Sequence, residues 1–535
     1  MAKKRSIRPA LFCLVSILGC VSPSALRAAE FNLGTATVAD INAAFDAGAL
    51  TSEKLIELCL ARIKAYDSAG PRLNAVITLN PRALEIAREL DAERKTKGPR
   101  SPLHGIPVVL KDLYDTFDMP TTGASKALAD NQPPDDAFTV ARLRASGAVI
   151  FAKVNLNELA SGSGYNNSLK GQTKNPYDLT RTPGGSSGGT GAAIAANFAI
   201  LGTGTDTGQS IRSPASANSC VGIRPSFGLI SRDGIIPGSY TQDTTGPIVR
   251  YVADLAAMLD AMVGFDPSDT ATWAGIGKAP KTYTASLDKN GLKGARIGFL
   301  PQLLGDGSHP EHALVAATME KSIEAMKAAG ATVVPIEIPE VARYLVHGNE
   351  ISVGGFETKW TMDAYFAHNG PNSKFKSLAD YIAGGSDSNP RVFASLKRAS
   401  EATEDALRSP EYLKRLENQA RFRDALIAAM DRQNLDALFY PLQRRLVVPA
   451  IAEPDQVERN GFLASGTGLP ALTVPGAFSP PTADAPKGVP IGVEFLGRSF
   501  AEPTLIRLAY AFEQTTHHRV PPASTPALPG ETFSY

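Results

Sequence analysis

Short apolar runs alternate with amphipathic helical patterns along most of the chain, and this alternation most constrains its fold. In the segment 138–160, a helical stretch, a glycine turn, an apolar run and a second helical stretch follow one another. In the segment 191–207, a helix of small residues leads into another apolar run. Strands that alternate with helices in this way predict an α/β layered fold.

Other segments extend the same pattern towards both ends of the chain. Leu55, Cys59 and Ile63 have helical spacing, and Thr51 is suited to cap that helix. The run from Ile106 to Leu110 is typical of a buried strand, and Lys111 ends it. Near the C-terminus, two strands and an amphipathic helix are predicted within 470–518, whereas the signals between 264 and 440 are weaker.

The composition is that of an ordinary globular protein. The chain has 535 residues, 43% of them hydrophobic, which is ample material for a core. No linker divides it, so a single domain over residues 30–535 is predicted.

The first 29 residues resemble a secretory signal peptide. They contain five basic residues and no acidic one, then an apolar run, then small residues around Ala28 and Ala29. The run is too short for a membrane-spanning helix, which needs about 20 residues. We therefore expect an exported protein, periplasmic or secreted. The stretch ending at Cys20 also resembles a lipoprotein cleavage site, so a lipid-anchored form stays open.

Charge and cysteine content exclude several classes of protein. Without the five basic residues of the signal, 49 of the 54 basic residues remain against 53 acidic ones, which does not suggest a nucleic-acid or anionic-membrane partner. Outside the signal the chain has Cys59 and Cys220, for which one disulfide is an open alternative. No CxxC or HExxH motif supports a metal site, and nothing in the sequence calls for a cofactor.

Two glycine-rich turns contain serines: TPGGSSGGTGAA at 182–193 and GTDTGQS at 204–210. Apolar segments lie close on both sides, which argues against a flexible linker. A phosphate-binding loop needs a lysine after its glycines, where Thr190 and Gly191 stand. Ser187 lies in a G-x-S-x-G pattern, but that motif requires a preceding strand, and the residues before it are typical of a loop.

A serine hydrolase that does not use histidine fits these turns better, because none of the seven histidines lies in a diagnostic context. A serine hydroxyl is a poor nucleophile until a base removes its proton. Lysine can be that base where burial lowers its pKa from about 10.4. A second hydroxyl can relay the proton, because it both donates and accepts hydrogen bonds.

With these motifs the chain resembles the amidase signature family over most of its length, most weakly in the middle. The resemblance lies in TPGGSSGG, GTDTGQSIRSPAS and HGIPVVLKD, and in GLPALTVP near the C-terminus. It implies a mixed β-sheet covered by helices on both faces, and hydrolysis of amides by a Ser–Ser–Lys set. The ending THHRVPP is similar to peptide amidases and aryl acylamidases of that family.

Carried over position by position, the resemblance implies that Ser210 is the nucleophile, Ser186 the bridging serine and Lys111 the base. The separation of the serines, 210 − 186 = 24 positions, agrees with the family's spacing. A cis peptide bond is implied before Ser186. The implied oxyanion hole consists of backbone N–H groups of Thr207, Gly208, Gln209 and Ser210.

Gln209 departs from the commonest family pattern, which has glycine there. Its N–H group is retained, but the added Cβ would disfavour a left-handed backbone conformation. Asp206 and Arg212 flank Ser210 and form either a supporting ion pair or an ordinary solvated one.

The expected activity is hydrolysis of a carboxamide C–N bond through an acyl-enzyme on Ser210. An esterase or carbamate (urethane) hydrolase could use the same residues. A third interpretation is the glutaminase subunit of tRNA-dependent transamidation, which works in the cytoplasm with partner subunits, so the signal argues against it. A catalytically inactive binding protein is the last alternative. The expected partner is a small-molecule or peptide amide substrate; acyl and amine specificity and oligomeric state stay open.

Overall fold

The computed structural model describes residues 1, 29–161, 167–346, 350–384, 389–450 and 457–535. Residues 2–28, which include Cys20 and nearly all of the expected signal peptide, lie outside the described residues. The signal and lipoprotein interpretations therefore stay predictions.

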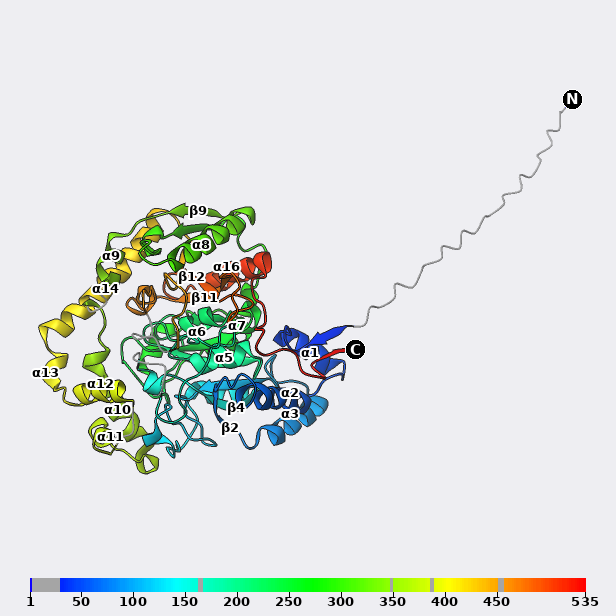
Figure 1. Cartoon of the computed structure of the whole chain (residues 1–535), viewed down its shortest axis with the longest axis horizontal. Helices are drawn as coiled ribbons and strands as arrows, with labels where there is room; N and C mark the ends of the chain where they lie inside the picture. The colour runs from blue at the N-terminus through cyan, green and yellow to red at the C-terminus, as the bar shows by residue number, and fades with distance from the viewer. Residues whose placement is uncertain (2–28, 162–166, 347–349, 385–388, 451–456) are drawn as a thin grey trace.

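One large mixed sheet runs through the molecule (Figure 1). Within the described residues it has eleven strands, in the order β2-β4-β3-β5-β7-β6-β11-β12-β10-β8-β9. β3 pairs in parallel with β4 and β5, and β8 with β9 and β10, whereas the other neighbours are antiparallel. The strands are β2 (Val76–Leu79), β3 (Pro107–Lys111), β4 (Val149–Val154), β5 (Leu201–Asp206), β6 (Val221–Arg224), β7 (Thr244–Val249), β8 (Arg296–Phe299), β9 (Thr332–Pro335), β10 (Ala437–Pro441), β11 (Ala471–Phe478) and β12 (Pro490–Leu496).

Helices pack on both faces of this sheet, which confirms the predicted α/β class. The principal helices are α1 (Val38–Asp46), α2 (Ser52–Arg62), α3 (Ala83–Lys97), α4 (Phe138–Ala145), α5 (Gly188–Ala195), α6 (Arg212–Ala217), α7 (Val252–Met262), α8 (Glu311–Ala328), α9 (Pro339–Val346), α10 (Gly354–Asn369), α11 (Leu378–Gly384), α12 (Pro390–Ser400), α13 (Glu404–Leu407), α14 (Pro410–Arg432), α15 (Phe462–Ser465) and α16 (Glu502–Thr516). A separate pair, β1 (Glu30–Asn32) and β13 (Thr532–Ser534), joins the two ends of the described chain.

The alternation of side chains along β3 assigns each residue to one face of the sheet. Val108 and Leu110 belong to the core cluster that contains α4, α7 and α16, whereas Val109 belongs to the cluster that contains α3 and α5. Because successive strand residues point to opposite faces, Lys111 lies on the same face as Val109. Strand β3 thus directs Lys111 towards the start of α5, where the first serine turn lies.

Two expectations need correction. The second helical stretch predicted after β4 is only one 3₁₀ turn, η3 (Glu158–Ala160), because Leu159 and Ala160 have φ of 49° and 54°, in the left-handed region that a helix cannot continue. The region 264–440, where the sequence signals are weak, contributes five helices, α9 to α13, between 339 and 407, and the long helix α14.

Cys59 and Cys220 are both buried and free, so the open alternative of a disulfide between them is not realised. Among the described residues, no helix combines the length and apolar character needed to cross a membrane.

Candidate active site

Lys111 ends β3 in the interior, with no exposed surface. Its Nζ lies 2.7 Å from Ser186 Oγ and 2.8 Å from Thr205 Oγ1. Burial lowers the pKa of Lys111 to about 7, against the opposing effect of the Asp206 and Asp243 carboxylates. A neutral amine has two N–H groups and one lone pair, so it can donate to one hydroxyl and accept from the other.

Ser186 belongs to a turn whose geometry requires glycine. The Gly185–Ser186 peptide bond is cis, as the family resemblance implies. Gly184 has φ of +70°, and a Cβ there would lie 2.7 Å from the Ser213 carbonyl oxygen. A Cβ at Gly189 would lie 2.3 Å from the Asn155 carbonyl oxygen. The glycines around Ser186 thus let backbone segments approach each other too closely for any side chain.

Ser210 lies in the turn that follows β5, beside the first serine turn. Its carbonyl oxygen accepts a hydrogen bond from the Ser187 N–H at 3.2 Å. The Gly208 carbonyl oxygen accepts from Arg212 Nη2 at 2.8 Å, and that of Gln209 from the Ser213 N–H at 2.7 Å. As far as the structure describes the chain, the N–H groups of Thr207, Gly208 and Ser210 donate to no other residue. The turn therefore uses its carbonyl groups internally and leaves amide donors available.

Gln209 adopts its position without the expected backbone strain, because neither it nor Gly208 has a positive φ. The concern about a left-handed conformation is therefore wrong. Gln209 is 2% exposed, and its side chain packs against Gly461: a Cβ at that glycine would lie 2.5 Å from Gln209 Cβ. The missing side chain at Gly461 makes the room that Gln209 occupies.

Asp206 and Arg212 form a fully buried ion pair and not a solvated one. Arg212 Nε donates to Asp206 Oδ2 at 3.1 Å, and Arg212 Nη1 donates to Glu494 Oε1 on β12 at 2.8 Å. Arg224 Nη1 donates to Asp206 Oδ1 at 3.1 Å. Burial alone would raise the pKa of Asp206, but Arg212 and Arg224 together hold it below its usual value. Four charged side chains thus anchor the turn to β6 and β12.

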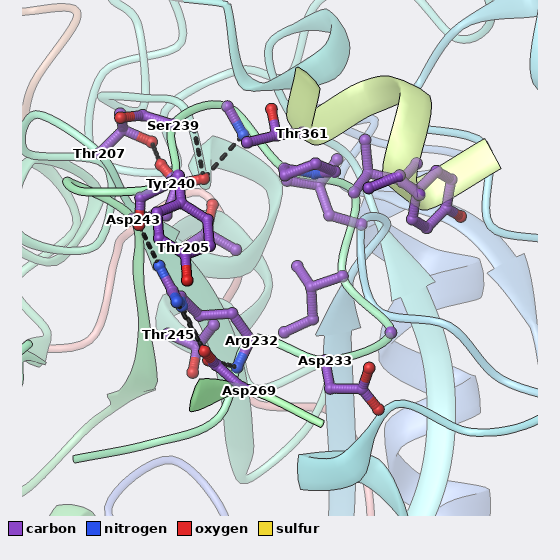
Figure 2. A pocket seen from close by; sticks show the side chains of 18 of the residues that line it. Thr205, Thr207, Arg232, Asp233, Ser239, Tyr240, Asp243, Thr245, Asp269 and Thr361 are labelled. Atoms are coloured by element: carbon purple, nitrogen blue, oxygen red, sulfur yellow. Dashed lines mark hydrogen bonds and ion pairs between the residues drawn. The ribbon is translucent and has the colours of Figure 1, made fainter. Parts of the chain in front are cut away.

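Thr205 and Thr207 line a cavity of about 310 Å³ (Figure 2). Thr207 Oγ1 donates to Asp243 at 2.5 Å, and Arg232 is paired with Asp269 at 2.6 Å in its wall. A second cavity of about 410 Å³ is lined by residues of α10 and α12 and also reaches Thr207. Both cavities open next to the turn of Ser210, which gives space for a substrate on that side.

The structure brings together the residues that the resemblance assigns, and it also separates Ser187 from Lys111. Ser187 is fully buried, and its Oγ donates at 3.5 Å to the Thr205 carbonyl oxygen. Sequence reasoning missed Thr205, the second hydroxyl on Lys111, and Asp243. Their signal was weak: Thr205 alternates with Thr203 on β5, on the face that meets Lys111. Within the described ranges, no cluster of three or more His, Cys, Asp or Glu side chains could hold a metal ion.

Comparison with known proteins connects this fold and site to one family. The sequence model of the family described as Amidase matches residues 54–506. A protein of Arabidopsis thaliana named as a probable amidase is 36% identical over 529 residues, which cover 95% of each chain. The peptide amidase of Stenotrophomonas maltophilia superimposes with a TM-score of 0.82 at 38% identity, over 92% of this chain and 99% of that one.

A further relative, from Halorhodospira halophila, has another activity in its name, that of a glutamyl-tRNA(Gln) amidotransferase. It is 31% identical over 509 residues, which cover 91% of this chain and 98% of that protein. The class defined by fold and comparison is the α/β hydrolases that act on amide C–N bonds. The chain belongs to the amidase family, and it is an amidase.

The contact between Gln209 and Gly461 gives a first prediction. Gly461→Ala should displace Gln209 and with it the amide donors of the turn, lowering kcat/KM for an amide by about 10²-fold, the cost of a lost oxyanion donor. Because Gly461 has φ of −57°, alanine brings no backbone strain of its own. The double variant Gly461→Ala/Gln209→Gly should recover part of the loss. Equal loss in the single and double variants would contradict this packing.

Proposed function

We propose that this amidase hydrolyses a carboxamide through an acyl-enzyme on Ser210, with Ser186 as proton relay and Lys111 as base. One observation carries the assignment: a wholly buried lysine, with its pKa lowered to about 7, lies 2.7 Å from the Ser186 hydroxyl. Such a lysine is neutral in a large fraction of molecules near neutral pH, so its lone pair can accept a proton.

The proposed reaction has two halves. In the first, Ser210 Oγ attacks the amide carbonyl carbon while its proton passes to Ser186 Oγ, and the Ser186 proton passes to Lys111 Nζ. The amide N–H groups of Thr207, Gly208, Gln209 and Ser210 stabilise the oxyanion. The C–N bond then breaks, and the proton returns through Ser186 to the leaving amine. In the second half, water attacks the acyl-enzyme by the same relay, releasing the carboxylic acid and restoring Ser210.

The two cavities beside Thr207 favour a substrate larger than a simple primary amide. Tyr240, 54% exposed, stands in the wall of the first cavity, and Met362 and Leu396 stand in the wall of the second. Apolar walls on either side of the turn suit a peptide amide or an anilide. The structural similarity to the peptide amidase of Stenotrophomonas maltophilia supports the peptide.

Two other activities are compatible with the same residues. An esterase or carbamate hydrolase would use the same acyl-enzyme, and rates on matched amide, ester and carbamate substrates separate these cases. The similarity to the amidotransferase of Halorhodospira halophila favours a glutaminase as the second candidate. Release of ammonia from free glutamine by the isolated chain, comparable in rate to its best amide, would support that candidate.

Export is also part of the proposal, on the grounds of the basic, apolar and small-residue pattern of the first 29 residues. The mature protein should begin near Glu30, or at a lipidated Cys20. Mass spectrometry of protein from the cell-envelope fraction measures this. An intact Met1 in cytoplasmic protein would contradict export and strengthen the glutaminase candidate.

Serine labelling tests the assigned roles. Ser210→Ala should abolish turnover and covalent labelling by a serine-directed phosphonate, because no acyl-enzyme can form. Ser186→Ala and Lys111→Met should each lower kcat by about 10³-fold or more, and their combination by little more, since the two act as one unit. Ser187→Ala is the matched control, because it removes the neighbouring hydroxyl and leaves the relay intact. Labelling on Ser187 would overturn the assignment.

The pKa of Lys111 predicts the pH profile. Protonated Lys111 cannot accept a proton, so kcat/KM on a neutral amide should rise with pH through about 7 and then level off. At two pH units below this pKa the rate should be about 100-fold below the plateau.

Two variants connect that titration to Lys111 and not to a histidine. Thr205→Val keeps the shape but removes a hydroxyl that stabilises the charged amine, so the rising limb should move to lower pH. His368→Gln, in the wall of the same cavity, should leave the limb in place. A limb that moves with His368 and not with Thr205 would exclude Lys111 as the base.

A further inference from the structure

A small cavity lies at the opposite end of β7 from the turn of Ser210. Thr244, at the start of β7, pairs with Asp206 next to that turn, whereas Tyr251 follows the other end of the strand. Six strand residues at roughly 3.3 Å each place the two sites about 20 Å apart. The cavity, of about 160 Å³, lies where β11 meets the C-terminal end of α16, both labelled in Figure 1.

Arg519, in the wall of this cavity, has a guanidinium group without hydrogen-bond partners. Its Nε, Nη1 and Nη2 atoms are all buried and unpaired. In the described part of the chain no other arginine has all three nitrogens in this state; buried Arg62, for comparison, bonds three carbonyl groups and the Glu531 carboxylate. The guanidinium carbon lies 5.5 Å from the centroid of the Tyr251 ring, but a ring face replaces none of the five N–H bonds that the group can donate.

The charges around Arg519 do not supply a counterion. Arg250 is buried nearby and repels it. The two nearby carboxylates are engaged elsewhere: Asp254 accepts from the Val38 N–H at 2.8 Å, and Glu513 from the Val252 N–H at 2.9 Å. Among described residues neither carboxylate lies within ion-pair distance of Arg519. Burial also raises the pKa of Glu513 to about 8, so near neutral pH this side chain is mostly uncharged.

The cavity offers polar groups beside Arg519. His518 Nδ1 is buried and unpaired, and the Gln514 side chain lies in the wall. An arginine fork pairs with two oxygens of one carboxylate, phosphate or sulfate group. The imidazole can accept from an O–H of such a group, or donate to its oxygen when charged. The C-terminal dipole of α16 opposes an anion, but its half charge is smaller than the full charge of the guanidinium.

We propose that this cavity binds a small oxyanion, held by the Arg519 guanidinium and oriented by His518 and Gln514. Its volume exceeds the roughly 30 Å³ that one water occupies in the liquid by about five times, which accommodates a phosphate, a sulfate or a short carboxylate. The site is separate from the catalytic residues, so the proposal stands or falls independently of the proposed function.

Calorimetric titration of the whole chain with inorganic phosphate tests this proposal, in a buffer matched in ionic strength with potassium chloride. One phosphate per chain should bind saturably, and the thermal midpoint should rise with phosphate more than with chloride. Sulfate and acetate titrations then distinguish a tetrahedral from a carboxylate ligand. Saturable binding of any one of the three supports the site.

Variants locate the binding. Arg519→Met should weaken phosphate binding at least about tenfold, because the fork is lost. Gln514→Glu, at a half-buried helical position, supplies a carboxylate to Arg519 in place of the ligand and should weaken binding as much, so it decides the matter where Arg519→Met does not fold. Arg408→Met, at an arginine that is 77% exposed, is the matched control and should bind phosphate normally. No response beyond that to chloride, or unchanged binding in Gln514→Glu, would overturn the proposal.

Discussion

A buried network of two arginines and two carboxylates holds the turn that carries Ser210. Arg212 contacts Asp206, Glu494 and two backbone carbonyl oxygens, and Arg224 contacts Asp206 from the neighbouring strand. Removing one partner of such a pair leaves an uncompensated buried charge, at a cost of about 3–5 kcal/mol. The turn therefore has few alternative geometries of comparable energy, which suits amide donors that must be in place before charge develops on a substrate.

The same network influences the electrostatics of Lys111. Asp206 is close enough to favour the charged amine, but its own charge is already shared between Arg212 and Arg224. Desolvation of Lys111 therefore prevails, and its pKa falls to about 7. A free carboxylate at Asp206 would favour a permanently protonated lysine, which could not act as a base. Pairing beneath the turn and a neutral lysine beside it are thus two consequences of one arrangement.

Local patterns in the sequence predicted the fold near the site well. The uninterrupted apolar run Ile106–Leu110 reflects a strand buried on both faces, and the parallel pairing of β3 with β4 and β5 agrees with it. The weakly signalled helices between 339 and 432 were not recognised individually. The segment after β4 failed for a specific reason: residues with helical propensity there adopt left-handed conformations, and the Asn157 N–H donates to the Ser186 carbonyl oxygen. Contacts such as Arg212 with Glu494 join residues far apart in sequence, and no local spacing predicts them.

The anchoring of the Ser210 turn on β12 has a consequence for biosynthesis. Glu494 comes 284 positions after Ser210 (494 − 210), so a ribosome must complete most of the chain before the turn receives its last charged partner. Contacts of such long sequence separation form late and slowly in folding. Nascent chains therefore contain both serines and the lysine long before these residues can acquire their native geometry. Hydrolytic capacity should emerge only at the end of folding, which would spare amides in the compartment where the chain is made.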